Sequence, residues 1–331
     1  MKKWMPLLLV VVILAGGLWY WKSGTRTAPP AQNKTAAGLN REVTLINPVG
    51  PLVIPVIALD KGKIAGDVKV AVKYWKTNDE VVAMLSKGDV DFAVLPITQA
   101  ANLYAKQKNL VLVGVHEWKV FYLVAANNAE FNDWRSLKGK TVYTPPSKGQ
   151  TADVLMRAGI AKEELKPDED VKISYATPPE IIALFQSGKI DFAALPEPYA
   201  TQAIAGDKGK IVLDFQKFWG ELTAGPEQLP VAGLFVTKQF MDSYPAETAK
   251  VEKLFADSTT WGNVNIDQAI DLSKEIFPVP QPVMKDAMQR IDFHYVASKD
   301  AQKETDAFLK KMNELYAPAL PTVPDAGFYS K

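Results

Sequence analysis

The sequence contains a near-repeat spaced by one hundred residues, and this repeat constrains the fold more than any other feature. Residues 79–101 read DEVVAMLSKGDVDFAVLPITQAA, and residues 179–201 read PEIIALFQSGKIDFAALPEPYAT. Without gaps, the two copies share a glycine, an aspartate–phenylalanine–alanine run and a leucine–proline pair. We therefore expect two similar structural units within one chain.

Each copy predicts a helix followed by a buried strand. Apolar residues recur at helical spacing before Gly88 and Gly188. A glycine at this point is typical of a helix that ends in the left-handed conformation. A short apolar strand then runs to Pro96 or Pro196. Because ligands bind at the carboxyl ends of strands in open α/β sheets, the repeat predicts two α/β lobes facing each other across a cleft.

The composition excludes several classes of protein. The chain has 331 residues, is 47% hydrophobic and carries a formal charge of +1, so it lacks the basic excess of nucleic-acid binders. It has no cysteine, which excludes disulfides, thiolate zinc sites, thiol nucleophiles and a lipid-modified cysteine. We therefore expect no nucleic-acid partner, and any membrane anchor must be part of the polypeptide itself.

An uncharged apolar run follows two lysines at the amino terminus. Residues 4–21 read WMPLLLVVVILAGGLWYW, which is near the lower limit for crossing a bilayer. Residues 1–22 are therefore predicted to direct export as a signal peptide or membrane anchor, and the lack of a clear cleavage site favours an anchor. Residues 23–40 have the composition of a flexible linker, so the folded part is expected to begin near Arg41.

Strand and helix patterns then alternate. Strands are expected at 42–46, 68–75, 110–116, 120–125, 141–144, 170–177, 210–215 and 231–237, and late helices at 246–256, 266–276, 283–291 and 301–316. We assign residues 41–126 and 232–331 to the first lobe and residues 127–231 to the second. The chain would then cross between the lobes near 125–128 and near 229–233. Two crossings predict a hinge rather than a loose linker.

Loops at the carboxyl ends of the predicted strands supply polar groups. The turn at 47–51 follows the first strand and precedes a helix from Leu52, while Asn78 or Asp79 can cap the repeated helix. The loop at 145–151 contains Ser147 and Lys148 and leads into another helix. Its free amides, hydroxyls and ammonium group could hold an anionic or strongly polar ligand group. A helix cap with a solvated lysine is the alternative interpretation.

Two longer segments resemble a known family. These are LKGKTVYTPPSKGQTADVLMRAGI at 137–160 and DVKISYATPPEIIALFQSGKIDFAALPEPYATQAI at 170–204. They are similar to the second lobe of the solute-binding proteins of ATP-binding-cassette importers in the nitrate, sulfonate and taurine group, which also includes pyrimidine-precursor binders. DFAVLPITQAANLYAKQ at 91–107 and PDAGFY at 324–329 extend the resemblance to most of the chain.

The resemblance implies the type II periplasmic-binding-protein fold, an α/β architecture of two lobes joined by a double-crossing hinge. It implies a monomeric receptor, without a cofactor or metal, that traps a small polar molecule of the sulfonate, nitrate, taurine or pyrimidine-like class for a membrane permease. The expected ligand contacts, given by position, are Pro48, Val49, Gly50, Thr98, Gln99, Ser147, Lys148, Gly149, Gln150, Thr151, Glu197 and Tyr199.

Glu197 decides the expected charge of the ligand. Its repeat partner is Ile97, and a polar residue in one copy only suggests recognition, although a surface carboxylate at a helix start is the alternative. If Glu197 points inward, it would repel nitrate or sulfonate and favour a zwitterion or a nitrogen heterocycle. If it points outward, a simple anion remains open.

Catalysis has little support in the sequence. The only histidines, His116 and His294, are interpreted as structural, and so are the duplicated Asp91 and Asp191. No P-loop, H-E-x-x-H or G-x-S-x-G motif occurs. Trp75 and Trp118 could stack on a ligand, but we interpret both as core aromatics. An enzyme on the same fold, of the pyrimidine-precursor or menaquinone-pathway type, and a ligand-sensing receptor remain the alternatives.

Overall fold

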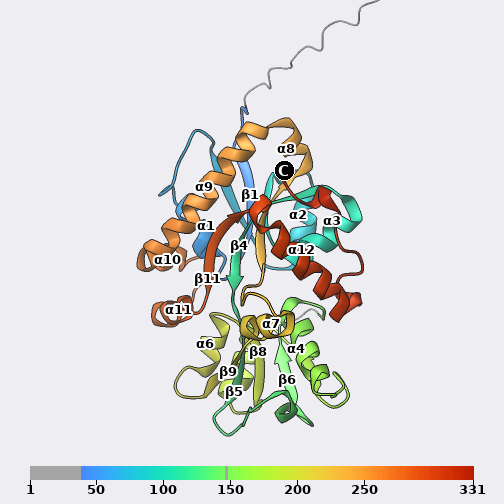
Figure 1. Cartoon of the computed structure of the whole chain (residues 1–331). Helices are drawn as coiled ribbons and strands as arrows, with labels where there is room; N and C mark the ends of the chain where they lie inside the picture. Colours follow the sequence, from blue (N-terminus) through green and yellow to red (C-terminus); the bar gives the residue numbers. More distant parts are fainter. Residues whose placement is uncertain (1–38, 146–147) are drawn as a thin grey trace, which may run out of the picture. The chain divides into compact units, whose positions relative to one another are not determined.

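The computed structural model describes residues 39–145 and 148–331, which form two β-sheets (Figure 1). The strands of the first sheet lie in the order β11-β4-β10-β3-β1-β2. They are β1 (Val43–Pro48), β2 (Val70–Trp75), β3 (Phe92–Pro96), β4 (Leu110–Lys119), β10 (Ala232–Thr237) and β11 (Asp292–Ala297). The second sheet has the order β7-β6-β8-β5-β9. Its strands are β5 (Phe121–Ala126), β6 (Thr141–Thr144), β7 (Lys172–Tyr175), β8 (Phe192–Pro196) and β9 (Gly209–Asp214).

Both sheets follow the same plan. In the first, β1 pairs in parallel with β2 and β3, and β10 lies antiparallel between β3 and β4. In the second, β6 pairs in parallel with β7 and β8, and β5 lies antiparallel between β8 and β9. In each sheet the antiparallel insert is the first strand after the chain arrives from the other sheet. The predicted α/β architecture with two lobes is confirmed; we call each sheet with its helices the first or second lobe.

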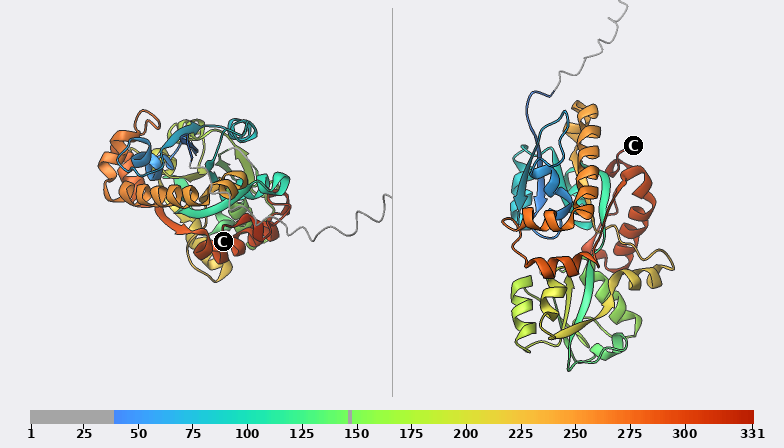
Figure 2. Two further views of the ribbon diagram at one scale, coloured as in Figure 1. Left: turned by 90° about the horizontal axis from the view of Figure 1, so that it is seen from above. Right: turned by 90° about the vertical axis from the view of Figure 1, so that its left-hand side faces the viewer.

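Helices cover both sheets. The first lobe has α1 (Val53–Asp60), α2 (Asn78–Ser86), α3 (Ile97–Gln107), α8 (Lys238–Ser243), α9 (Pro245–Val264), α10 (Ile266–Ser273), α11 (Gln281–Met288) and α12 (Ser298–Leu315). The second has α4 (Thr151–Lys162), α5 (Pro178–Gln186), α6 (Tyr199–Ile204) and α7 (Phe215–Thr223). The long helix α9 packs along α1, as Figure 2 shows, and α12 packs on β4. Helices α9 and α12 thus lie against elements of the first sheet.

The repeat corresponds to one structural unit used twice. The first copy forms α2 and β3, and the second forms α5 and β8. Gly88 and Gly188 follow the helices with φ of 77° and 70°, the left-handed conformation that glycine adopts without strain. The register is also equivalent, because Phe92 lies beside Leu45 of β1 and Phe192 beside Val142 of β6.

Two expectations about the elements need correction. The strand Phe121–Ala126, which we had assigned to the first lobe, pairs with β8 and β9 of the second sheet. The first crossing therefore lies at Val120 and not at 125–128, because only sheet pairing, and no local sequence pattern, assigns β5 to the second sheet. The second crossing lies between α7 and β10.

The other correction is β11, a strand within the region expected to be helical, which pairs antiparallel with β4. In addition, α11 contacts α6 and α12 contacts α4, so both also touch the second lobe.

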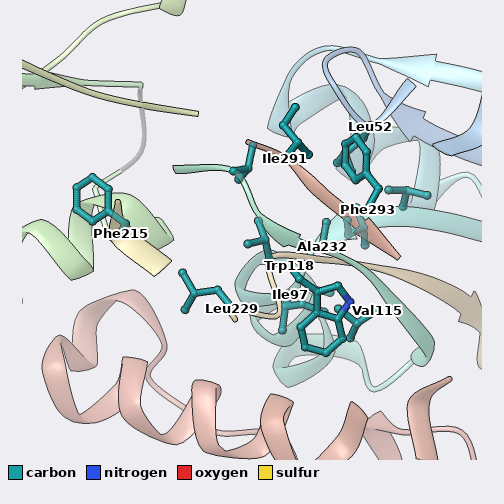
Figure 3. Close-up of a cluster of buried hydrophobic side chains, with 14 of the residues drawn as sticks. Leu52, Ile97, Val115, Trp118, Phe215, Leu229, Ala232, Ile291 and Phe293 are labelled. Atoms are coloured by element: carbon teal, nitrogen blue, oxygen red, sulfur yellow. The ribbon is translucent and has the colours of Figure 1, made fainter. Parts of the chain in front are cut away.

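The two crossings are tied to each other by backbone hydrogen bonds. The amide of Leu229 donates to the carbonyl of Trp118 (3.0 Å), and the amide of Val231 donates to the carbonyl of Glu117 (2.9 Å). Figure 3 shows the apolar side chains at this junction, where Leu229 and Ala232 are fully buried. The two crossing segments are therefore hydrogen-bonded to each other and buried, and they form the double-crossing connection between the lobes.

The predicted anchor and linker lie outside the described residues. Within the range that the structure describes, no helix combines the length and the apolar character needed to span a bilayer.

Candidate functional site

A pocket of about 220 Å³ lies where the carboxyl ends of strands from both sheets meet. The first lobe contributes Trp75, Asn78, Pro96 and Gln99. The second contributes Phe121, Thr144, Pro145, Gln150, Ala152, Asp153 and Pro196. Ligands bind in this position in open α/β sheets, so the pocket is the candidate site.

The sequence repeat builds both walls of the pocket. Pro96 ends β3 and Pro196 ends β8, and these equivalent prolines both line the pocket. Helices α3 and α4 then begin at the rim and bring in Gln99 and Gln150. The cleft that we expected between the two copies of the repeated unit therefore corresponds to this pocket.

The start of α2 presents an amide pair to the pocket. We expected Asn78 or Asp79 to cap this helix, but the cap is Thr77, whose hydroxyl accepts from the amide of Glu80 (3.2 Å). The cap leaves the Asn78 side chain free to accept from Nε2 of Gln99 (3.1 Å). Both amides line the pocket and retain further donor and acceptor capacity.

Aromatic rings supply the apolar part of the pocket lining. Trp75 ends β2 and Phe121 begins β5, so the two rings come from different lobes. Trp75 is only 6% exposed, so the interpretation as a core residue holds, and it also lines the pocket. Trp118 instead stacks on His294 (5.4 Å between ring centroids) and does not line the pocket.

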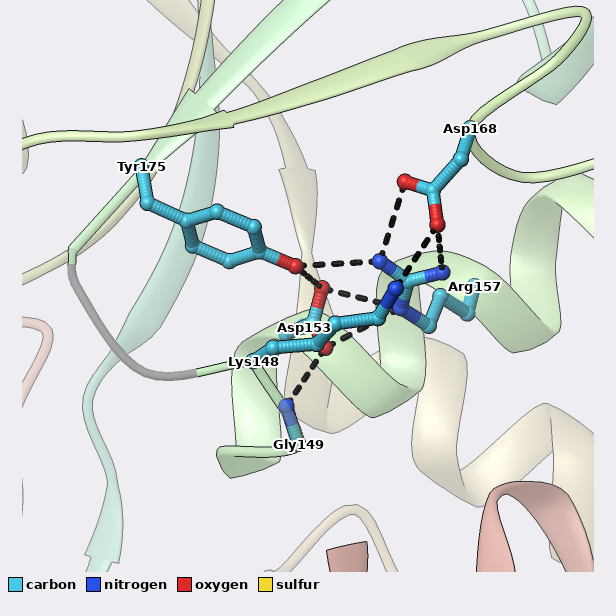
Figure 4. A network of polar contacts seen from close by, with 6 residues as sticks. All are labelled: Lys148, Gly149, Asp153, Arg157, Asp168 and Tyr175. Atoms are coloured by element: carbon cyan, nitrogen blue, oxygen red, sulfur yellow. Dashed lines mark hydrogen bonds and ion pairs between the residues drawn. The ribbon is translucent and has the colours of Figure 1, made fainter. Parts of the chain in front are cut away.

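An ionic network, buried at Asp153 and Arg157 and exposed at Lys148 and Asp168, supports the second-lobe wall (Figure 4). The Asp153 carboxylate accepts from the amide of Gly149 (2.7 Å), from Nε of Arg157 (3.0 Å) and from the Tyr175 hydroxyl (2.8 Å). Beyond it, Asp168 accepts from Arg157 (2.8 Å) and from Lys148 (3.0 Å).

The ion pairs of the network shift the pKa values of Asp168 and Lys148 so that both side chains stay charged. The Arg157 guanidinium holds the pKa of Asp168 below its usual range, and Asp168 raises the pKa of Lys148. Arg157 is only 7% exposed, so it depends on the two carboxylates to offset the cost of burying its charge. Lys148 and Gly149, which directly precede α4 and its cap, are thereby fixed to the helix.

Of the residues expected to contact the ligand, Gln99 and Gln150 line the pocket. Ser147 lies outside the described residues. The turn with Pro48, Val49 and Gly50 lies next to the pocket, where the amide of Val49 donates to the carbonyl of Trp75 (2.8 Å), but it forms no part of the wall. Thr98 and Thr151 are buried in the first turns of α3 and α4.

Three other expected contacts are engaged within the protein. The Lys148 ammonium binds Asp168, and the Gly149 amide, which we had expected to meet a ligand anion, donates to Asp153. The Tyr199 ring packs edge-on against Phe277 (6.1 Å between centroids), and burial raises the pKa of this tyrosine.

Glu197 is the main correction. Its carboxylate is fully buried and lies neither in the pocket nor at the surface. It accepts from Nε of Arg290 (2.6 Å) and from the amide and hydroxyl of Thr201 (3.0 and 2.8 Å). Arg290 precedes β11 of the first lobe, so this ion pair connects the two lobes. Pro196, one residue earlier, takes the place in the pocket lining that we had expected for Glu197.

The residues interpreted as structural do have structural contacts. Asp91 accepts from both terminal nitrogens of Arg41 (2.6 and 2.7 Å) and from the amide of Thr44 (2.9 Å). His116 is fully buried with its ring edge-on to Phe255, and burial lowers its pKa to about 3. Nδ1 of His294 lies 2.7 Å from Asp292. Neither histidine lines the pocket.

Most of the pocket lining was not among the expected ligand contacts. Asp153, Thr144 and Phe121 were not singled out, although Thr144 ends a predicted strand and could have been found by the strand-end rule. A larger pocket of about 750 Å³ lies elsewhere, but first-lobe residues alone line it, among them Tyr104, Met241 and Tyr329. It lacks the contribution of two lobes that marks the candidate site.

The sequence of the chain matches the model of the NMT1-like family over residues 53–276, which is more than half of its length. The chain belongs to the NMT1-like family. The resemblance deduced from the sequence is thereby confirmed.

Comparison with individual proteins agrees with this assignment. A Bacillus subtilis (strain 168) protein named for the binding of aliphatic sulfonates is 24% identical over 214 residues, which is 63% of this chain. The aligned part spans 60% of that relative's length. An ABC transporter structure from Parabacteroides distasonis is 25% identical, with a TM-score of 0.73, and the alignment covers 88% of this chain and 99% of that one.

More distant structures share the fold. The periplasmic aliphatic sulphonate binding protein of Escherichia coli aligns with a TM-score of 0.66 at 19% identity, over 86% of this chain and 90% of that one. The periplasmic nitrate-binding protein of Synechocystis PCC 6803 aligns with the same TM-score at 15% identity, over 82% of this chain and 80% of that one. The fold of the NMT1-like protein is thus the periplasmic-binding-protein fold.

Proposed function

We propose that this NMT1-like protein is an extracytoplasmic solute-binding receptor of an ATP-binding-cassette importer. It would hold one small polar molecule between its lobes and deliver it to a membrane permease. The observation that carries the proposal is the pocket at the carboxyl ends of strands from both sheets. Membership of the family and the binding functions named for its relatives support it.

A binding function also suits the chemistry of the pocket better than catalysis does. Asp153 is the one ionisable side chain among the described residues of the pocket lining. Its carboxylate already accepts three hydrogen-bond donors, so it is poorly placed to act as a general base or nucleophile. The enzyme interpretation therefore has no supporting residue among the described residues of this pocket.

Location and assembly follow from the same proposal. We propose that residues 1–22 direct export and remain as an anchor, that residues 23–40 act as a tether, and that the receptor works as a monomer. The apolar run at 4–21 and the absence of a clear cleavage site motivate the anchor. The intact mass of the protein exported by a bacterial host tests it, since a mature chain starting between residues 15 and 40 would contradict a retained anchor.

A thermal-shift screen of the full chain tests the proposed function. Sulfonates, nitrate, taurine, pyrimidines and amino acids are added in turn, because a ligand that binds only the native state raises the melting temperature by mass action. We expect a concentration-dependent rise with at least one compound. If no compound from any of these classes changes the melting temperature, the proposal is contradicted.

Variants from the two lobes then locate the binding. Gln99→Ala and Gln150→Ala should each weaken binding of that compound by about 1–3 kcal/mol, because each removes a polar side chain from the pocket wall. Gln107→Ala is the matched control, since Gln107 is exposed at the far end of α3 from Gln99. An affinity that neither pocket variant changes would place the ligand elsewhere.

A further inference from the structure

The charge of the pocket is unlike that of a site for a simple anion. Among the described lining residues the one charged side chain is a carboxylate, Asp153, and no lysine or arginine is present. The two neighbouring residues that the structure does not describe, Pro146 and Ser147, are uncharged by sequence. A dehydrated anion in this pocket would therefore meet no cationic side chain of the described lining.

The cations closest to the pocket are already paired. Arg157 contacts Asp153 through Nε and Asp168 through its terminal nitrogens, and Lys148 contacts Asp168 (Figure 4). The network contains two carboxylates and two cations, so its formal charge is zero. Neither Arg157 nor Lys148 lines the pocket.

The amino terminus of α4 is occupied in the same way. A helix start attracts anions through its free N–H groups and its dipole. Here Asp153, the third residue of α4, places its own carboxylate at that end and accepts from the amide of Gly149. The protein thus supplies internally the negative charge that a bound anion would otherwise bring.

The remaining walls suit an uncharged ligand with amide-like groups. Asn78, Gln99 and Gln150 offer neutral donors and acceptors, Thr144 offers a hydroxyl, and Trp75 lies on the apolar side. The volume of about 220 Å³ lies below the roughly 300–1,000 Å³ of pockets for drug-sized ligands. The pocket therefore fits a small molecule that combines an apolar surface with neutral polar groups.

We propose that the pocket selects a small uncharged molecule of the carboxamide, sulfonamide or lactam class and discriminates against sulfonate, carboxylate and nitrate ions. Asp153 sets this preference by occupying the anion-binding positions of Gly149 and Arg157. The proposal rests on the proposed function, because it takes this pocket as the ligand site.

Titration calorimetry with matched acid and amide pairs tests the preference in the full chain. Suitable pairs are methanesulfonate with methanesulfonamide, benzoate with benzamide, and nicotinate with nicotinamide, because the members of each pair have nearly the same size. We expect the amide to bind at least tenfold more tightly in every pair that binds. Tighter binding of the anion would overturn the inference and leave the proposed function intact.

The absence of binding in all pairs also has a defined meaning. If the wider screen described above still yields a ligand, the proposed class is wrong and the receptor function stands. If that screen yields none either, the proposed function falls together with the class.

Variants of the network test the role of Asp153 itself. In Asp153→Asn the side-chain oxygen can still accept from Gly149, but the guanidinium of Arg157 loses one of its two counter-charges and keeps only Asp168. We expect the affinity ratio of amide to acid to fall at least tenfold. Asp168→Asn, at a partly exposed position, should move the ratio in the same direction if the buried variant does not fold.

Glu169→Gln is the matched control, because it removes one negative charge beside Asp168 from an exposed side chain whose described partner is Lys166. It should leave the ratio unchanged. A folded Asp153→Asn or Asp168→Asn protein with the wild-type ratio would overturn the assignment of the preference to this network.

Discussion

At the residue scale, the adjacent buried residues His116 and Glu117 have opposite effects on stability. Burial lowers the pKa of His116 to about 3 and raises that of Glu117 to about 8. The unfolded chain titrates near 6.5 and 4.5 respectively. Burial of His116 thus lowers the free energy of unfolding as the pH falls below about 6.5, because only the unfolded chain then takes up a proton. Burial of Glu117 lowers it as the pH rises from about 4.5 to 8, because only the unfolded chain then releases the carboxyl proton.

The window from pH 6.5 to 8 isolates Glu117. Glu117→Gln should raise the free energy of unfolding at pH 8 by a few kcal/mol, because each pKa unit corresponds to about 1.4 kcal/mol. The difference from wild type should grow with pH across the window, as measured by urea unfolding at several pH values. Glu314→Gln, at an exposed site of α12, is the control. A constant difference between Glu117→Gln and wild type would contradict the assignment.

At the scale of elements, the ion pair between Glu197 and Arg290 connects β8 of the second lobe to the segment before β11 of the first. Arg290→Ala leaves a fully buried carboxylate without its cation, so we expect a loss of about 3–5 kcal/mol in the free energy of unfolding. Glu197→Gln combined with Arg290→Met should lose clearly less, because no buried charge remains. Denaturant unfolding of the single and double variants measures this. A double variant no more stable than Arg290→Ala would show that the buried charge is not the cause.

The sequence predicted those elements that carry a strong local pattern. The repeated unit, the strands β6 and β10 and the late helices α9 to α12 are confirmed, because their apolar periodicity and their Gly or Pro boundaries agree with the tertiary structure. The strand at 120–125 was expected, but its lobe was assigned wrongly, because only sheet pairing shows that β5 belongs to the second sheet. The strand β11 was missed because Phe293 is its one buried residue, so it shows no apolar alternation, and because it lies between helices.

The site was harder to predict than the fold, for a related reason. Its position at the strand carboxyl ends follows from topology, and the family resemblance indicated Gln99 and Gln150. The direction of a charged side chain depends on partners distant in sequence. Glu197 turns to Arg290, 93 residues away, and Lys148 turns to Asp168, 20 residues away. No local pattern indicates such pairings.

At the scale of the whole molecule, three features occur together: two copies of one helix–strand unit, two chain crossings that are hydrogen-bonded to each other, and a pocket lined by both lobes. Hydrogen bonds between the crossings at Trp118 and Leu229 hold the connection together. A ligand in the pocket would contact both lobes at once and so favour the closed arrangement over the open one.

A crystal structure of the complex with the compound that gives the largest thermal shift tests this account most directly. We predict that the ligand lies between the lobes, within hydrogen-bond distance of Asn78 or Gln99 on one side and of Thr144 or Gln150 on the other. A ligand bound on one lobe only, such as in the larger pocket beside Tyr104 and Met241, would contradict the account.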